Sequence, residues 1–211
     1  MWKVGLIKIY EGLTLNDPVR DADLIFVIAG RMERKQYGLQ LFKAGWAPKL
    51  ILSIGRFEVS KMSRLNLNGI KELIMLRDQT PPQERHFFLT VDASGIGTEK
   101  VRLRRWSTYG EVLALRSLLE NKNVRRVIVI STDIHLRRLA FTLEKVFRNM
   151  PVEFLFCPVP FPLTSLRKEK WWATAEDRHF VLKEMMKLVG YWIILSMPAR
   201  AIRFLMRLKK S

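Results

Sequence analysis

The chain has 211 residues, of which 48% are apolar, and its 37 lysines and arginines outnumber its 20 aspartates and glutamates, which gives a formal net charge of +17. This length supports one hydrophobic core but leaves little room for two full domains, and the single cysteine excludes an internal disulfide bond. The positive charge favours a phosphate-bearing partner, such as a nucleotide, a phosphorylated lipid, an anionic membrane or a nucleic acid. A generally basic surface without a specific partner explains the charge equally well.

Short apolar runs alternate with helix-like segments along the chain. Five runs predict strands buried on both faces, because most of them lack polar alternation: Leu24–Ile28, Leu50–Ser53, Phe87–Val91, Val127–Ser131 and Val152–Cys157. Four segments predict helices: Glu33–Ala44, Ser60–Arg77, Thr108–Glu120 and His135–Phe147. The segment Glu99–Trp106 is either an edge strand or an extended arm. The alternation predicts an α/β fold with a mostly parallel sheet of about five strands and helices on both of its faces.

The two ends of the chain bear on its relation to a membrane. Met1–Tyr10 lacks an apolar stretch of signal-peptide length, and no run reaches the roughly 18 apolar residues that span a bilayer, so we expect a cytoplasmic protein. After Pro198, basic residues fall on one side of a helical wheel and apolar residues on the other. We therefore divide the chain into a domain over residues 1–197 and a basic amphipathic helix over residues 198–211. This helix suits the inner face of an anionic plasma membrane, with docking on the domain or an oligomer contact as alternatives.

In a parallel α/β sheet, ligands bind at the carboxyl ends of the strands, where the next helices begin. At the first such junction, Gly30 permits a sharp exit from the strand, and Arg31 and Arg34 fall around the first turn of the helix. A salt bridge to Glu33, or simple solvation, would account for either arginine alone. We nevertheless select Gly30 and Arg34 as candidate ligand-binding residues.

A second junction has the same form, with Ser53 and Gly55 at a strand end and Arg56 after them. A simple turn explains this junction when it is taken alone.

The third junction, in the stretch STDIHLRRLAF, carries one of only three histidines. His135 and Arg138 are three residues apart and fall on one side of a helix, whereas Arg137 points elsewhere. Ser131 offers a hydroxyl group, and Asp133 is expected only to cap the helix. The alternative for His135 is a histidine satisfied at the edge of the apolar face.

These cations have a common explanation. A helix start carries a partial positive charge and free N–H groups, so a cation placed there is repelled unless an anion joins it. Arg34 and the pair His135 and Arg138 show this arrangement at two strand ends that should lie side by side. The simplest reason is a shared anion, such as a phosphate or pyrophosphate group.

Thr108 and Glu111 have the spacing of a capping box, in which each side chain satisfies a free N–H group at the start of a helix. On spacing alone, this is the preferred interpretation of the pair.

Motifs for metals and nucleotides are missing from the sequence. Three scattered histidines and one cysteine give no metal-ligand spacing, so we predict no metal site. No phosphate-binding GxxxxGK[ST] loop and no dinucleotide-binding fingerprint is present.

In order and content, these junctions resemble the YdcF/SanA/ElyC-like family (domain of unknown function 218). Four pieces carry the resemblance: Asp23–Gly30 with Arg34 and the helix that ends at Gly45, then Leu50–Gly55, Ser107–Glu111 and Val127–Arg138. The His-x-x-Arg sequence after a strand is the most specific of them. The chain departs from the family pattern at Arg31, Ile54 and Glu111, and residues 56–100 match poorly.

The resemblance implies a Rossmann-like three-layer fold over most of the chain. It also implies a site formed by Gly30, Arg34, Ser53, Gly55, Thr108, Glu111, Ser131, His135 and Arg138. Some family members are tied to bacterial envelope biogenesis and to the polyprenyl phosphate lipid carrier, and one is reported to bind S-adenosylmethionine. S-adenosylmethionine is therefore one cofactor to consider, and Mg²⁺ is another if a phosphate ester is hydrolysed.

Our leading hypothesis is a peripheral membrane enzyme or binder that acts on a phosphorylated lipid carrier or a related pyrophosphate compound. If it is catalytic, it is a phosphate-ester or pyrophosphate hydrolase or transferase. His135 would then be the general acid or a phosphate ligand, while Arg34 and Arg138 would hold the anion. The alternative is a Rossmann-like binder of a nucleotide or S-adenosylmethionine without turnover. A nucleic-acid binder is a weaker third alternative, since only the charge supports it.

Overall fold

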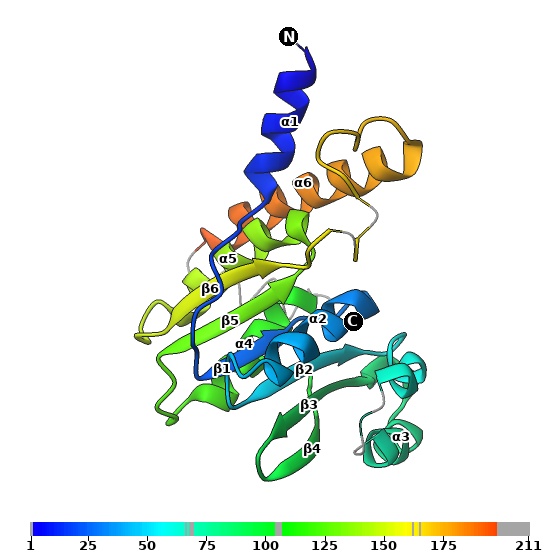
Figure 1. Cartoon of the computed structure of the whole chain (residues 1–211), viewed down its shortest axis with the longest axis vertical. Helices are drawn as coiled ribbons and strands as arrows, with labels where there is room; N and C mark the ends of the chain where they lie inside the picture. Colours follow the sequence, from blue (N-terminus) through cyan, green and yellow to red (C-terminus); the bar gives the residue numbers. More distant parts are fainter. Residues whose placement is uncertain are drawn as a thin grey trace.

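A computed structural model of the chain describes residues 2–65, 67, 70–103, 107–161, 163–164 and 166–197. Its centre is a six-stranded sheet with the strand order β4-β3-β2-β1-β5-β6 (Figure 1). The strands are β1 (Leu24–Val27), β2 (Leu50–Gly55), β3 (His86–Asp92), β4 (Gly95–Lys100), β5 (Arg126–Ser131) and β6 (Glu153–Pro158). The α-helices are α1 (Trp2–Leu13), α2 (Met32–Lys43), α3 (Ile70–Asp78), α4 (Ser107–Leu119), α5 (Asp133–Phe147) and α6 (Ala175–Leu195), with 3-10 helices η1 (Val59–Leu65) and η2 (Pro82–Glu84).

The parallel part of the sheet consists of β2, β1, β5 and β6. At its centre, Phe26 of β1 pairs with Ile51 of β2 on one side and with Val129 of β5 on the other. All four residues of β1 are buried, which explains why this strand reads as an unbroken apolar run. The predicted α/β class and the mostly parallel sheet are therefore confirmed.

The sheet has one strand more than we expected, namely β4. It lies at the edge, beyond the expected strand β3, and both strands are antiparallel to their neighbours. β3 pairs with β2, and β4 pairs with β3. The edge strand spans Gly95–Lys100, so the edge-strand alternative for Glu99–Trp106 holds only for Glu99 and Lys100, and residues 101–103 belong to no helix or strand. The strand begins at Gly95 because of a tight turn: Asp92 accepts a hydrogen bond from the backbone N–H of Ser94 at 3.0 Å, and Gly95 follows with φ 125°. Residues 104–106 lie outside the described part of the chain.

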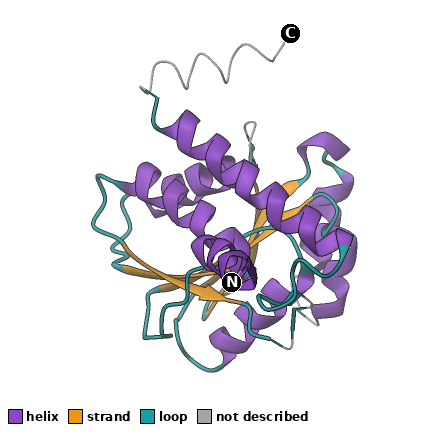
Figure 2. Cartoon of the chain, turned by 90° about the horizontal axis from the view of Figure 1, so that it is seen from above, coloured by secondary structure: helices purple, strands orange, loops and turns teal. Residues whose placement is uncertain are grey.

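Helices cover both faces of the sheet, and two apolar clusters form the core between them (Figure 2). On one face, α2, η1 and α3 contribute Leu39, Met62 and Leu73. On the other face, α4 and α5 contribute residues such as Val112 and Leu139. Alternate side chains of each central strand enter opposite clusters, as the two-residue period of a strand requires.

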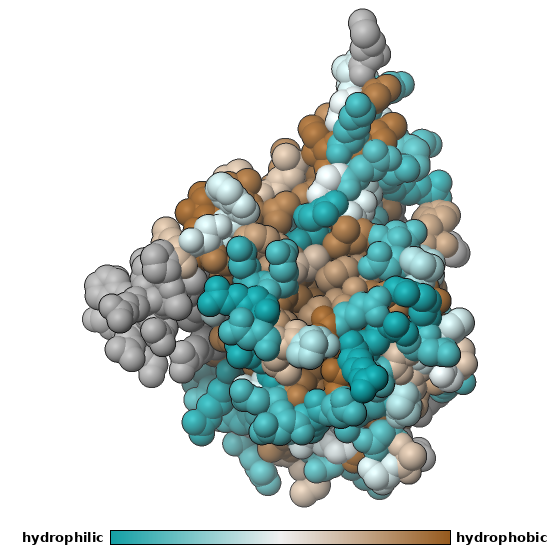
Figure 3. All heavy atoms as spheres, turned by 90° about the vertical axis from the view of Figure 1, so that its left-hand side faces the viewer, coloured by the Kyte–Doolittle hydropathy of each residue, from teal (hydrophilic) through white to brown (hydrophobic). Residues whose placement is uncertain are grey.

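Helices α1 and α6 form a further layer against α5, and neither helix was among the expected elements. A third apolar cluster joins Tyr10 of α1, Ile134 of α5 and Val181 of α6, together with Trp171. Helix α1 projects beyond the rest of the molecule (Figures 1 and 3). Among the described helices, none combines the length and the apolar content that crossing a bilayer requires.

Two other helix predictions need comment. The single helix expected over Ser60–Arg77 was wrong, since η1 ends at Leu65 and α3 begins at Ile70. The intervening sequence Asn-Leu-Asn-Gly is rich in poor helix formers, which explains the break. The amphipathic helix predicted over residues 198–211, and with it the second part of the chain, lies outside the described residues.

Gly38 sets how closely α2 approaches the sheet. A Cβ atom at this position would lie 2.4 Å from Cγ2 of Val27, which is completely buried in β1. We therefore expect Gly38→Ala to lower the free energy of unfolding by about 1–3 kcal/mol, as for an overpacked core. Urea denaturation measures this change. Gly190→Ala is the matched control, since open space surrounds that helical glycine and the same substitution should stabilise the protein by up to about 1 kcal/mol. Equal stability of Gly38→Ala and the native chain would contradict the packing argument.

Candidate functional site

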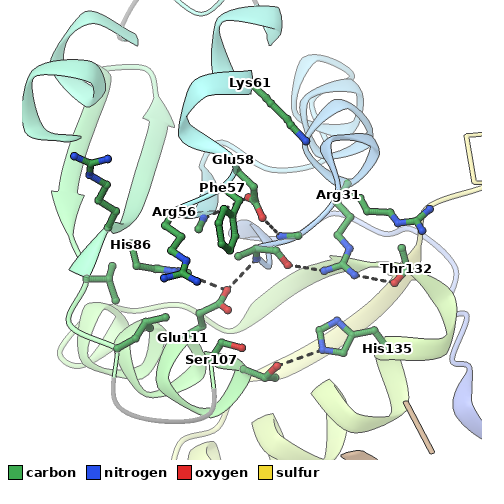
Figure 4. A pocket seen from close by; sticks show the side chains of 18 of the residues that line it. Arg31, Arg56, Phe57, Glu58, Lys61, His86, Ser107, Glu111, Thr132 and His135 are labelled. Atoms are coloured by element: carbon green, nitrogen blue, oxygen red, sulfur yellow. Dashed lines mark hydrogen bonds and ion pairs between the residues drawn. The ribbon is translucent and has the colours of Figure 1, made fainter. Parts of the chain in front are cut away.

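A cavity of about 1120 Å³ lies at the carboxyl ends of β1, β2 and β5. The strand order reverses at β1: the chain runs outward from β1 through β2 to β4, then returns to β5 on the other side. In open α/β sheets, such a reversal leaves a crevice in which ligands bind. Glu58 after β2, Glu111 on α4, and Thr132 and His135 at the start of α5 come from three different segments and converge on this space (Figure 4).

The structure brings the predicted site residues together. Seven of them line the cavity: Gly30, Arg34, Gly55, Thr108, Glu111, His135 and Arg138. The other two, Ser53 and Ser131, are completely buried beneath it and hydrogen-bond to its lining. Arg137 is exposed and donates to the carbonyl of Gly12, so the prediction that it points elsewhere is confirmed.

Arg34 is buried where the N-termini of α2 and α5 meet. Its guanidinium donates to the carbonyl of Ala29 at 2.6 Å and to the hydroxyl of Thr132 at 2.8 Å, while its Nε has no partner among the described residues. The group lies against Gly30, where a Cβ atom would be 2.6 Å from one of its nitrogens and where φ is +138°. Burial lowers the pKa of Arg34 to about 10, so the side chain is still a cation at neutral pH.

Neither of these helix N-termini has a side-chain cap. Arg31 is the N-cap of α2 and makes no capping hydrogen bond. Thr132 is the N-cap of α5, but its hydroxyl accepts from Arg34 instead of from the helix backbone. Asp133, which we expected to cap α5, accepts from the adjacent N–H of Ile134 and from the hydroxyl of Tyr10. The partial positive charges of two helix dipoles thus add to that of the buried guanidinium.

His135 and Arg138 meet at Thr108, as their spacing predicts. The Thr108 hydroxyl accepts from Arg138 at 2.7 Å and lies 3.4 Å from Nε2 of His135, whose Nδ1 is 2.8 Å from the hydroxyl of Ser131. Burial, and then the positive charges of Arg138 and Arg34, hold the pKa of His135 well below its usual range. The imidazole is therefore neutral at pH 7.

Arg138 also has an acidic partner that our sequence analysis missed. Two of its nitrogens donate to Oε2 of Glu184 on α6, at 3.1 and 2.9 Å, and its guanidinium lies 5.0 Å from the ring centre of Tyr191. Lys187 approaches the other oxygen of Glu184 at 2.6 Å. Arg138 thus forms an ion pair inside the protein. Arg34 forms none within the described residues, although the negative charges of Glu111 and Glu58 act on it from nearby and partly oppose the lowering of its pKa.

Glu111 does not form the capping box that its spacing with Thr108 predicts. Its Oε2 accepts from the backbone N–H of Ala29 at 2.9 Å and from the hydroxyl of Ser53 at 2.6 Å. The Ser53 hydroxyl uses its single O–H to donate this hydrogen bond to Glu111. It can therefore only accept from Nε2 of His86, at 2.7 Å, which places the proton of that imidazole on Nε2. Burial raises the pKa of Glu111 and lowers that of His86 to about 4.

Glu58 is a second carboxylate that our sequence analysis missed. It accepts from the N–H of Gly30 and from Lys35, whose Nζ lies 2.5 Å from Oε2. Lys35 is completely buried, and this burial lowers its pKa although Glu58 opposes the change. The sequence did contain a sign of Glu58, because this carboxylate follows the predicted site residue Gly55 by three positions. No comparable signal marked Glu184 or His86, which become neighbours of the site only through the tertiary fold.

The charge balance of the cavity lining is strongly positive. Nine lysines and arginines and four glutamates line it. The cations are Arg31, Arg34, Arg56, Lys61, Arg85, Lys100, Arg102, Arg138 and Lys187, and the glutamates are Glu58, Glu84, Glu111 and Glu184. Within the described residues, ion pairs compensate only Lys100, Arg138 and Lys187 of these cations. Arg56 lies 4.2 Å over the exposed ring of Phe57, and Arg31 lies 5.3 Å over Phe180. The cavity therefore suits an anionic ligand.

The lining also bears on the two cofactors considered. S-adenosylmethionine carries a sulfonium and an ammonium cation against a single carboxylate, so a lining with this excess of positive charge disfavours it. The described residues contain no group of three or more His, Cys, Asp and Glu side chains placed to hold a metal ion. A Mg²⁺ ion held mainly by phosphate oxygens needs only one or two carboxylates. Glu111 could supply one, because its Oε1 has no hydrogen bond within the described part of the chain.

Comparison of the chain with models of protein families, with curated proteins and with solved structures found no match. The resemblance to the YdcF/SanA/ElyC-like family therefore remains a prediction from sequence motifs.

The low pKa of His86 predicts a pH dependence of stability. Between an unfolded pKa of roughly 6.5 and the folded value of about 4, the unfolded chain binds more protons, so the free energy of unfolding falls as the pH falls through this window. The slope from one histidine is at most about 1.4 kcal/mol per pH unit. His135 acts in the same direction, whereas the raised pKa of Glu111 acts in the opposite one.

Comparison with His86→Gln isolates this contribution, because a glutamine amide can still donate to Ser53. Urea denaturation from pH 7 to pH 4 should give a shallower decline for the variant. Parallel curves for the two proteins would show that His86 titrates normally in the folded state.

Proposed function

We propose that this protein binds a phosphate-bearing ligand in the cavity, and that the ligand is a phosphorylated lipid carrier of the polyprenyl phosphate type or a related pyrophosphate compound. The observation that carries the proposal is Arg34. It is a buried cation with an unpartnered Nε, and it lies between two helix N-termini that lack side-chain caps. A phosphate oxygen there would accept from the guanidinium and from free backbone N–H groups together.

Other features of the site agree with a ligand larger than one phosphate group. Beyond Arg34, the cavity carries Arg31, Arg56, Lys61, Arg85 and Arg102, which form no ion pairs within the described residues. A volume of about 1120 Å³ exceeds what a single phosphate group needs. The exposed ring of Phe57 offers an apolar surface beside these cations. These features support a pyrophosphate or a phosphate ester with a sizeable apolar group.

If the ligand is turned over, His135 is the residue that we assign to proton transfer. In the free protein its imidazole is neutral, so it is ready to accept a proton from an attacking water and not to donate one. A bound phosphate would offset the positive charges of Arg138 and Arg34 and so raise the pKa of His135. The general-acid role then becomes available only in the complex.

The second candidate is a binder without turnover, and the state of two of the carboxylates in the cavity lining favours it. Glu58 is engaged by Lys35 and Gly30, and Glu184 is engaged by Arg138. Neither is free to act as a general base. An anionic nucleotide fits the lining as a ligand of such a binder, whereas the lining disfavours S-adenosylmethionine.

Replacement of Arg34 tests the binding proposal. Because charge-assisted hydrogen bonds contribute about 1.5–3 kcal/mol, Arg34→Met should weaken the binding of inorganic pyrophosphate about 10- to 100-fold in isothermal titration calorimetry. Arg137→Met, an exposed arginine on α5, is the matched control and should bind as the native chain does. Circular dichroism checks that both variants are folded. Equal affinity of Arg34→Met and the native chain, or no binding by either, would refute the proposed anion site.

Replacement of His135 separates turnover from binding. With a short-chain polyprenyl pyrophosphate as substrate, His135→Ala should reduce phosphate release about 10²- to 10⁴-fold and change pyrophosphate affinity only a few-fold. Release at the native rate would remove His135 from the mechanism. Saturable binding by the native chain without any release would select the non-catalytic candidate.

A further inference from the structure

Helix α6 carries an apolar stripe that the fold leaves uncovered. Leu182, Met186, Val189 and Ile193 follow one another at intervals of three or four residues, so they lie on one face of the helix. All four side chains are exposed, from 47% for Ile193 to 72% for Met186, and the neighbouring Trp192 is 60% exposed. A continuous apolar surface of this kind marks an interaction site in a soluble domain.

The other side of the same helix belongs to the cavity. Phe180, Glu184 and Lys187 line it, and Glu184 ties α6 to α5 through Arg138. The helix lies on the outside of the molecule with α1 beside it (Figure 2). A surface that bound the stripe would therefore lie one helix diameter from the proposed ligand site.

The charges around the stripe indicate what covers it. From Arg178 to the end of α6, the exposed charged residues outside the cavity are Arg178 and Lys183, and both are basic, since Glu184 is buried and Lys187 lines the cavity. A second copy of the chain would bring the same positive charges together in a symmetric contact, and each copy carries a net charge of +17. An anionic bilayer would attract them instead. The tryptophan at the edge of the stripe also suits the interface between headgroups and acyl chains.

We propose that α6 lies in the surface of an anionic membrane. Leu182, Met186, Val189 and Ile193 insert among the acyl chains, and Arg178 and Lys183 lie beside the headgroups. The helix rests on the bilayer and does not span it, which agrees with its modest length of apolar sequence. The docked helix holds the cavity close to the lipid surface, where the phosphate of a lipid-linked ligand would be found. Membrane docking by α6 does not depend on the proposed function, and the two can fail separately.

Vesicle co-sedimentation tests this inference with the full-length protein. The native chain should bind vesicles of phosphatidylcholine that contain phosphatidylglycerol, and should bind pure phosphatidylcholine vesicles much more weakly. Met186→Glu should reduce binding to the anionic vesicles about tenfold or more, because it places a carboxylate in the stripe. Met75→Glu is the matched control, since this methionine is 63% exposed on α3, and it should bind as the native chain does.

Several results would overturn the inference. One is the absence of binding to anionic vesicles, and another is equal loss of binding in Met186→Glu and Met75→Glu. Native binding by Met186→Glu, with loss of binding when Arg200, Arg203, Arg207 and Lys210 are changed to glutamine, would assign the membrane contact to the end of the chain. Light scattering that shows a dimer of the native chain and a monomer of Met186→Glu would identify a second copy as the occupant. Pyrophosphate affinity in these variants reports separately on the cavity.

Discussion

The side-by-side, parallel pairing of β1 and β5 is the constraint on which the site depends. These strands belong to distant parts of the sequence, yet the N–H of Ile28 donates to the carbonyl of Ile130 and holds their carboxyl ends together. Each strand is followed directly by a helix, so two helix N-termini, and two partial positive charges, arrive at one point. Arg34 bridges them by donating to Ala29 after β1 and to Thr132 after β5. Without this pairing, the residues that follow β1 and β5 would lie apart and could not form one site.

Most of the buried charge near the site is compensated within the protein. Lys35 is paired with Glu58, and Arg138 is paired with Glu184. A buried charge without a partner is costly, so these pairs are what allow such groups in the interior. Arg34 differs from Lys35 and Arg138, because its hydrogen-bond acceptors are a carbonyl and a hydroxyl oxygen, which carry no net charge. That imbalance is the physical reason to expect an anion from outside the chain.

Helix α6 connects two surfaces that would otherwise be separate. One side closes the cavity through Glu184 and Lys187, while the opposite side carries the exposed apolar stripe. Because Val181 of the same helix also packs in the core, the exposed stripe is a second apolar surface on α6, whereas a helix of a soluble domain is normally apolar only on its core-facing side. On the proposed membrane contact of α6, this arrangement would place the cavity beside the lipid surface.

The local pattern of the sequence determined the fold class, five of the six strands and three of the helices, because burial on both faces and the 3.6-residue period are properties of short segments. It also selected Arg34, His135 and Arg138, since cations at a helix start are anomalous wherever they occur. The sequence could not identify Glu58, His86 and Glu184 as partners in the site, and it misassigned Glu111 to a helix cap. Only the tertiary structure decided these contacts, because they join segments separated by up to 82 residues, as between Ala29 and Glu111. The hydrogen bond of a carboxylate depends on which donors the packed elements bring within reach, and spacing along the chain does not specify that.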